Sequence, residues 1–133
     1  MATVHLHQRT LDETLALLVR ARDYMSYAVP ANQNGLLPAE RLQISCEAMR
    51  LTARLSHVMA WLLAQKAVQA GEISPVAAAA AYRLSADDLC LLEDSAERTV
   101  ALPEGLRDLL DKSRALYVRV TRLDALVQRA ATA

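Results

Sequence analysis

The side chains that could do chemistry are few and scattered along the sequence. His5 and His7 have a spacing that could hold a metal, but no third ligand cluster stands nearby. His57 could act as a catalytic base, but no carboxylate at helical spacing is present to orient it. The sequence also has no Ser-His-Asp arrangement, Gly-rich phosphate loop or HExxH motif. We therefore expect no metal, no cofactor and no catalytic centre, with stray histidines at a frayed N-terminus.

A polar stripe is the strongest candidate for a binding surface. Its residues recur at i, i+3, i+7 and i+10, which places them on neighbouring turns of a helix: Glu47, Arg50, Arg54 and His57. Such a stripe is commonly a solvated face, but Arg is favoured at protein interfaces and binds carboxylates with two donors. An acidic segment is the oppositely charged candidate for partner binding: Asp87, Asp88, Glu93 and Asp94.

Composition limits the fold and the partners. The 133 residues are enough for one domain, are rich in Ala and Leu, and include no Phe and only 3 Gly. Ala and Leu are strong helix formers, whereas tight turns and phosphate loops need Gly. The 15 basic and 15 acidic residues cancel, which argues against nucleic-acid binding and a polybasic membrane anchor. Without a signal peptide or an apolar run of 18 residues, the chain is expected to be cytoplasmic.

Local signals predict an all-α, single-domain chain over residues 1–133. A capping box at Thr10 and Glu13 starts a first helix over 10–28, which ends before Pro30. Pro38 and Gly71 bound a long central helix over 38–70, and Pro103 opens a third helix over 103–130. The irregular crossover, residues 72–102, includes a short Ala-rich helix beginning at Ser74-Pro75. We expect a three-helix bundle with this crossover before the third helix.

Apolar spacing predicts which faces pack. The central helix has one stripe formed by Ile44, Ala48, Leu51, Leu55, Val58 and Leu62, and a second formed by Leu42, Cys46, Met49, Ala53 and Ala60. Two stripes predict two packing partners. On the third helix, a heptad-like seam has one polar interruption: Leu106, Leu109, Ser113, Leu116, Val120, Leu123 and Val127.

The helix lengths predict a homodimer. A first helix of roughly 19 residues spans about 28 Å and cannot cover a central helix of about 50 Å. Its uncovered apolar end would include Val58, Met59, Trp61, Leu62 and Leu63. The crossover, the third helix or another subunit must cover these residues, because an exposed apolar patch is a liability for a monomer.

The central helix also resembles a known family. Residues 45–55 (SCEAMRLTARL) and 58–72 (VMAWLLAQKAVQAGE) are similar to the signature of the RcdA (regulator of CtrA degradation) or DUF1465 family of alphaproteobacteria. Shorter matches flank it at residues 20–24 (RARDY), 82–84 (YRL), 102–104 (LPE) and 116–117 (LY). The resemblance implies a dimeric three-helix bundle without catalytic activity, which acts as an adaptor for the ClpXP protease. It also implies partners: a CpdR-like response regulator, a cyclic-di-GMP-binding adaptor (PopA), and substrates such as CtrA.

Two alternatives to an adaptor remain open at this stage. An all-helical enzyme of the chorismate-mutase type would need Arg50 or Arg54 to converge with other charged side chains in one enclosed polar pocket. A plain dimeric scaffold or a DNA-associated regulator is the other alternative, and zero net charge disfavours DNA.

Overall fold

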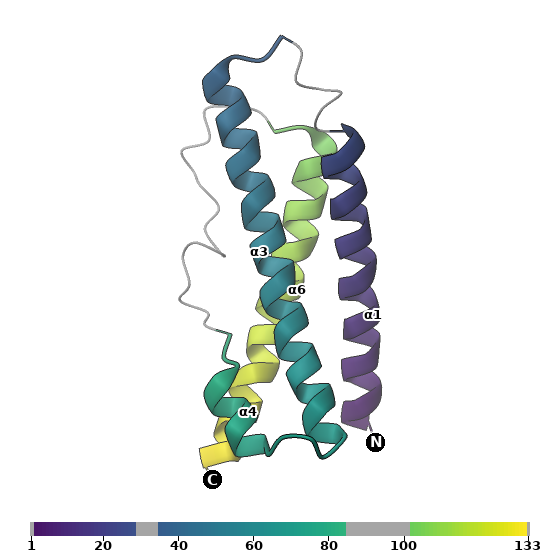
Figure 1. Cartoon of the computed structure of the whole chain (residues 1–133), viewed down its shortest axis with the longest axis vertical. Helices are drawn as coiled ribbons and strands as arrows, with labels where there is room; N and C mark the ends of the chain where they lie inside the picture. Colours follow the sequence, from purple (N-terminus) through teal and green to yellow (C-terminus); the bar gives the residue numbers. More distant parts are fainter. Residues whose placement is uncertain (1, 29–34, 85–101, 133) are drawn as a thin grey trace.

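The computed structural model describes residues 2–28, 35–84 and 102–132, and most of them are helical. Three long helices form a bundle, which confirms the predicted fold class (Figure 1). The elements are α1 (Ala2–Asp23), continued by a π-helical segment η1 (Tyr24–Ala28), then α3 (Pro38–Gln69), α4 (Pro75–Ala81) and α6 (Glu104–Thr132).

Both ends of α3 lie where the sequence signals place them. Pro38 occupies the first turn, where a missing N–H costs nothing, and the Leu37 N–H donates to Glu40 Oε1 at 3.4 Å. At the other end Gly71 has φ +77°, while the N–H groups of Gly71 and Glu72 donate to the carbonyls of Val68 and Ala67. This is the Schellman arrangement, which satisfies the last carbonyls of a helix. The central helix, predicted over 38–70, is observed over Pro38–Gln69.

The short helix of the crossover also forms as expected. The Ser74 hydroxyl accepts a hydrogen bond from the Ala77 N–H at 3.1 Å, and α4 then runs to Ala81. Ala78 and Ala79 are buried, and α4 packs on α3 and α6. The remainder of the predicted crossover up to residue 101 lies outside the described residues.

The predicted start of the first helix was wrong. Helix α1 begins at Ala2, and Thr10 does not cap it: its hydroxyl donates to the Leu6 carbonyl inside the helix, as that of Thr14 does to Thr10. The physical reason is packing, because His7 and Thr10 are both buried. His7 is therefore a core residue and not a stray terminal histidine.

The central helix uses one of its two predicted apolar stripes. The stripe from Ile44 to Leu62 is buried in the core, as expected. The second stripe was wrong as a packing surface, because Leu42 and Met49 are 66% and 72% exposed and Cys46 is exposed as well. Helix α6 instead packs on the side of α3 that includes Arg54 and Trp61, which bond to it. The apolar pattern did not predict this face of α3, because the face includes polar residues such as Arg54.

The seam predicted on the third helix is buried. Leu106, Leu109, Ser113, Leu116 and Val120 are at most 2% exposed, and Leu123 and Val127 pack at the edge of the core. Figure 1 shows α1 antiparallel to α3, whereas α3 and α6 run in the same direction. The C-terminal end of α3 and the N-terminal end of α6 therefore lie at opposite ends of the bundle.

The buried histidine makes stability depend on pH. Burial lowers the pKa of His7 below 6.5, and its Nδ1 lies 2.9 Å from the Gln69 amide nitrogen. The unfolded chain thus takes up a proton near pH 6.5 that the folded chain binds only at lower pH. The stabilising contribution of neutral His7 is complete above pH 6.5 and is lost as the pH falls through the lowered folded value.

We expect the free energy of unfolding, measured by urea titration, to decrease between pH 7 and pH 5.5, and to decrease less in His7→Gln. His57→Gln is the matched control, because His57 is exposed and its variant should keep the wild-type dependence. The same dependence in both variants would contradict the assignment.

Candidate partner-binding surfaces

The four residues of the polar stripe do not share one face. Glu47 and Arg54 are buried at 3% and 2% exposure, Arg50 is partly buried, and His57 is exposed. At 3.6 residues per turn the stripe drifts by about 80° around the helix, and the edge of the core passes through it. Arg50 Nη1 pairs with Glu47 Oε1 at 2.9 Å on the same helix. The stripe is therefore wrong as a single partner-binding face, and only Arg50 and His57 keep access to solvent.

Arg54 connects two helices across the core. Its Nη1 donates to the Leu110 carbonyl at 3.1 Å and to the Ser113 hydroxyl at 3.3 Å, while that hydroxyl donates to the same carbonyl at 2.9 Å. A buried guanidinium is costly unless its donors are satisfied, so these bonds are structural requirements. Ser113, the polar interruption of the α6 seam, is one of the acceptors for Arg54.

The chorismate-mutase alternative gains no support from this arrangement. Arg54 donates to a main-chain carbonyl and a hydroxyl of α6, contacts that join two helices and need no substrate. Four hollows in the described part of the chain are lined by residues other than Arg50 and Arg54.

A second buried polar cluster was not predicted. Asp124 is 4% exposed and accepts three hydrogen bonds: from Trp61 Nε1 at 2.8 Å, from the Leu84 N–H at 3.1 Å and from Gln128 Nε2 at 3.3 Å. Gln128 also donates to the Ala79 carbonyl of α4 at 2.8 Å. The available signal was its position, because Asp124 lies four residues after Val120 on the buried side of an otherwise basic helix end.

The apolar end of the central helix is covered by the chain itself. Val58, Trp61 and Leu62 are at most 2% exposed, Met59 packs at the edge of the core, and only Leu63 is largely exposed, at 51%. Trp61 packs edge-on against the His7 ring at a centroid distance of 5.6 Å. The expectation that the first helix cannot reach this end was wrong, because α1 begins eight residues earlier than predicted. The argument for a dimer from helix length therefore loses its basis.

An exposed apolar seam does run along α3, on its outer side. Leu42, Met49 and Leu63 are 66%, 72% and 51% exposed and occur at seven-residue multiples, with Ser56 in the remaining place. Small residues alternate with them at the same repeat: Cys46 and Ala60, which are exposed, and Ala53, which is partly buried against the core. We call these residues the outer α3 seam. Their spacing is that of a helix that packs against another helix.

Ion pairs join the exposed sides of α1 and α6. Arg20 Nη2 and Lys112 Nζ both lie 3.0 Å from Asp108 Oδ2, and Arg119 Nη2 lies 2.7 Å from Glu13 Oε1. The hydrogen bonds from Lys112 and then Arg20 lower the pKa of Asp108. The acidic candidates Asp87, Asp88, Glu93 and Asp94 lie outside the described residues, so no contact with this surface is assigned to them.

Two further features of the described ranges bear on function. No group of three His, Cys, Asp or Glu side chains within residues 2–28, 35–84 and 102–132 could hold a metal ion. Among the helices of those ranges, none combines the length and the apolar character needed to cross a membrane.

The buried aspartate provides a direct test of the described packing. Asp124→Ala leaves the Trp61 and Leu84 N–H groups unpaired in the core, and we expect a loss of about 3 kcal/mol in the free energy of unfolding. Urea denaturation measures the loss, and the emission of Trp61, the single Trp in the chain, should shift to longer wavelength. Asp111→Ala, on the exposed side of α6, is the control and should change stability by less than about 0.5 kcal/mol. Equal losses in the two variants would contradict the role of Asp124.

The comparisons with known proteins agree with this architecture. Residues 1–133 match the family described as "Protein of unknown function (DUF1465)". The crystal structure of RcdA from Caulobacter crescentus CB15 is similar, with a TM-score of 0.73 and 35% sequence identity over 92% of this chain and 90% of that chain. A search of curated proteins finds no match. Because the family match extends over the whole sequence, the chain belongs to the DUF1465 family.

Proposed function

We propose that this protein is a dimeric adaptor without catalytic activity, which helps deliver cell-cycle regulators to the ClpXP protease. The observation that carries the proposal is the similarity to RcdA, at 35% identity over 92% of the chain. The RcdA family takes its name from the regulation of CtrA degradation. By that similarity the partners are ClpXP, a CpdR-like response regulator, a cyclic-di-GMP-binding adaptor and substrates such as CtrA.

The described contacts are consistent with a protein that functions by binding partners at its surface. Arg54 and Asp124, which could each serve chemistry, are engaged in bonds between helices. The outer α3 seam and the α1/α6 side are separate surfaces on one bundle. An adaptor presents two surfaces at once, and each contact can be weak because linkage raises the effective concentration of the second partner.

The outer α3 seam supports dimerisation through a second copy of this chain. Its large residues alternate with small ones, so the same face on a partner copy can place Leu42 and Met49 against Cys46 or Ala53. A surface that fits a copy of itself is what a two-fold dimer requires. In this proposal the seam replaces Val58, Trp61 and Leu62 as the dimer contact.

Reconstituted proteolysis tests the proposed function. We expect purified ClpXP, supplied with the response regulator and the cyclic-di-GMP-binding adaptor, to degrade CtrA several-fold faster when this protein is added. Gel quantification of CtrA over time measures the rate, and a ClpXP substrate that needs no adaptor is the control. An unchanged CtrA half-life at saturating concentrations of this protein would overturn the adaptor function and leave a dimeric scaffold.

The dimer contact is tested by a charge placed in the seam. Met49→Glu would bury a carboxylate between two copies, and we expect the dimer dissociation constant to rise at least tenfold in sedimentation velocity. Leu126→Glu is the matched control, because Leu126 is a similarly exposed leucine (56%) on α6. A dimer that both variants preserve, or a wild-type protein that sediments as a monomer, would contradict the assignment.

A further inference from the structure

A hollow of about 390 Å³ lies between α1 and α6. Ala16 and Leu17 of α1 and Ala115 of α6 contribute its apolar lining, and the small side chains of Ala16 and Ala115 leave room between the two helices. The remaining lining residues are charged: Glu13, Arg20, Lys112 and Arg119. An apolar floor between charged walls suits a ligand that has both characters.

A second hollow of about 510 Å³ adjoins the first, and its described lining residues all belong to α6. It shares Ala115 and Arg119 with the first and adds Val118, together with the charged residues Asp111, Arg114 and Arg122. We call the two hollows together the α1/α6 groove. From Lys112 to Arg122 the groove extends about 15 Å along α6, at 1.5 Å per residue.

Charge in the groove is strongly uneven. Its lining has five basic side chains (Arg20, Lys112, Arg114, Arg119 and Arg122) and two acidic ones (Glu13 and Asp111), in a protein whose formal net charge is zero. Beyond Asp111 the only acidic residue of the chain is Asp124, which is buried. The exposed charges of this half of α6 are thus all positive. An anionic partner is the complement that such a surface attracts.

The ion pairs across the groove do not block such a partner. The paired side chains of Arg119 and Glu13 are 53% and 47% exposed, and those of Arg20 and Asp108 are 49% and 45% exposed. Exposed pairs of this kind contribute about 0–1 kcal/mol, so their cations can accept another carboxylate at little cost. Among the described residues, no hydrogen bond or ion pair involves Arg122.

The apolar floor favours a protein over a nucleic acid. A phosphate backbone offers no apolar side chains for Leu17, Ala115 and Val118, and nucleic-acid binding relies on a concentrated net positive charge. An amphipathic helix can place apolar residues on one side and carboxylates on the other, and helices commonly bind in grooves of this kind. Arg holds a carboxylate through two donors, which adds specificity to attraction.

We propose that the α1/α6 groove docks an acidic amphipathic segment of a partner protein. Apolar side chains of that segment lie on Ala115 and Val118, and its carboxylates bind Lys112, Arg119 and Arg122. The inference deepens the proposed function and rests on it, because an adaptor needs a second surface that binds a partner. It assigns that surface to α1 and α6, where the sequence pattern had suggested the central helix.

A designed peptide tests the groove directly. The probe is a fluorescein-labelled 14-residue peptide with Glu and Leu on opposite sides of a helix, compared with the same peptide with Lys in place of every Glu. We expect fluorescence anisotropy to show at least tenfold tighter binding of the acidic peptide, with affinity decreasing as salt increases.

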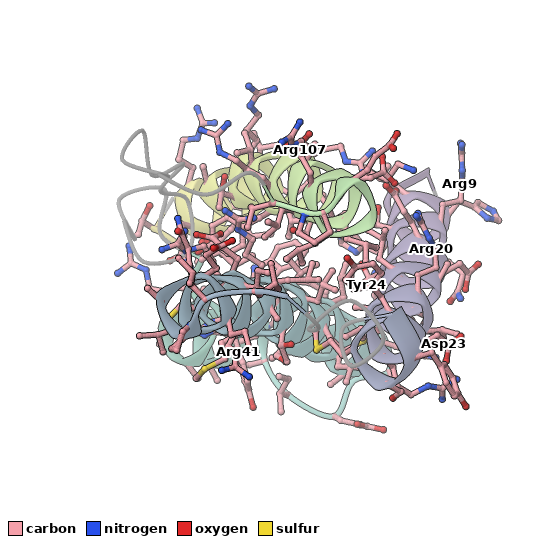
Figure 2. All side chains as sticks on the ribbon, turned by 90° about the horizontal axis from the view of Figure 1, so that it is seen from above. Arg9, Arg20, Asp23, Tyr24, Arg41 and Arg107 are labelled. Atoms are coloured by element: carbon pink, nitrogen blue, oxygen red, sulfur yellow. The ribbon has the colours of Figure 1, made fainter. Side chains whose placement is uncertain are left out.

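Variants separate charge from shape. Lys112→Glu/Arg122→Glu reverses the charge, and Ala115→Trp fills the floor without a charge change; each should weaken binding of the acidic peptide at least tenfold. Arg41→Glu is the control, because Arg41 is an exposed arginine of α3 that lies on the other side of the bundle from α6 (Figure 2). Circular dichroism melts identify any variant that fails to fold. The two groove variants change different residues, so if one does not fold, the other still tests the site.

Several results would overturn the docking site. These are equal binding of the two peptides, no loss in either folded groove variant, and an equal loss in Arg41→Glu. A change of sedimentation mass in the groove variants would make the groove a contact between copies. Tighter binding of a single-stranded RNA oligonucleotide, insensitive to Ala115→Trp, would make it a phosphate-binding face. None of these results changes the rate at which ClpXP degrades CtrA when the wild-type protein is added. A wrong assignment of the groove can therefore be distinguished from a wrong adaptor function.

Discussion

The arrangement of the bundle depends on one buried carboxylate. Asp124 holds an indole of α3, a main-chain N–H just beyond α4 and an amide of its own helix, so three parts of the chain meet at one side chain. A buried acceptor without a partner lowers the free energy of unfolding by more than a satisfied one raises it. The three donors must therefore all stay in place around the Asp124 carboxylate. Halfway along the bundle, the buried Arg54 of α3 likewise requires its acceptors on α6. These bonds fix which side of α3 faces α6, and so which side is left exposed.

Local sequence signals were enough to predict the helices that begin or end at a residue typical of helix termini. Pro38, Gly71 and Ser74 act within a single turn, and the structure places α3 and α4 accordingly. Thr10 misled the prediction of α1, because a threonine bonds equally well to the carbonyl four residues before it when the helix continues. That choice is decided by the burial of His7 against Trp61, which no local pattern contains.

The candidate surfaces were harder to predict than the fold. A pattern of apolar and polar residues assigns Glu47 and Arg54 to solvent, although both are buried and hydrogen-bonded, and assigns Leu42 and Met49 to the interior, although both are exposed. The two errors have one cause. Polar residues can face a neighbouring helix when that helix supplies matched partners, and only tertiary contacts reveal where the partners are. The basic character of α6 was visible in the sequence, but its juxtaposition with α1 was not.

The parallel course of α3 and α6 also has a consequence for how the chain folds. Helices α1 and α3 are antiparallel neighbours in sequence, so they can pair through a short connection soon after collapse. Helix α6 must close a much longer connection, at a greater cost in chain entropy, before its seam is buried. Contacts of α4 and Leu84 with the last turns of α6 shorten that connection once they form. The Asp124 cluster is therefore placed where it can guide α6 into the parallel orientation and against the antiparallel alternative.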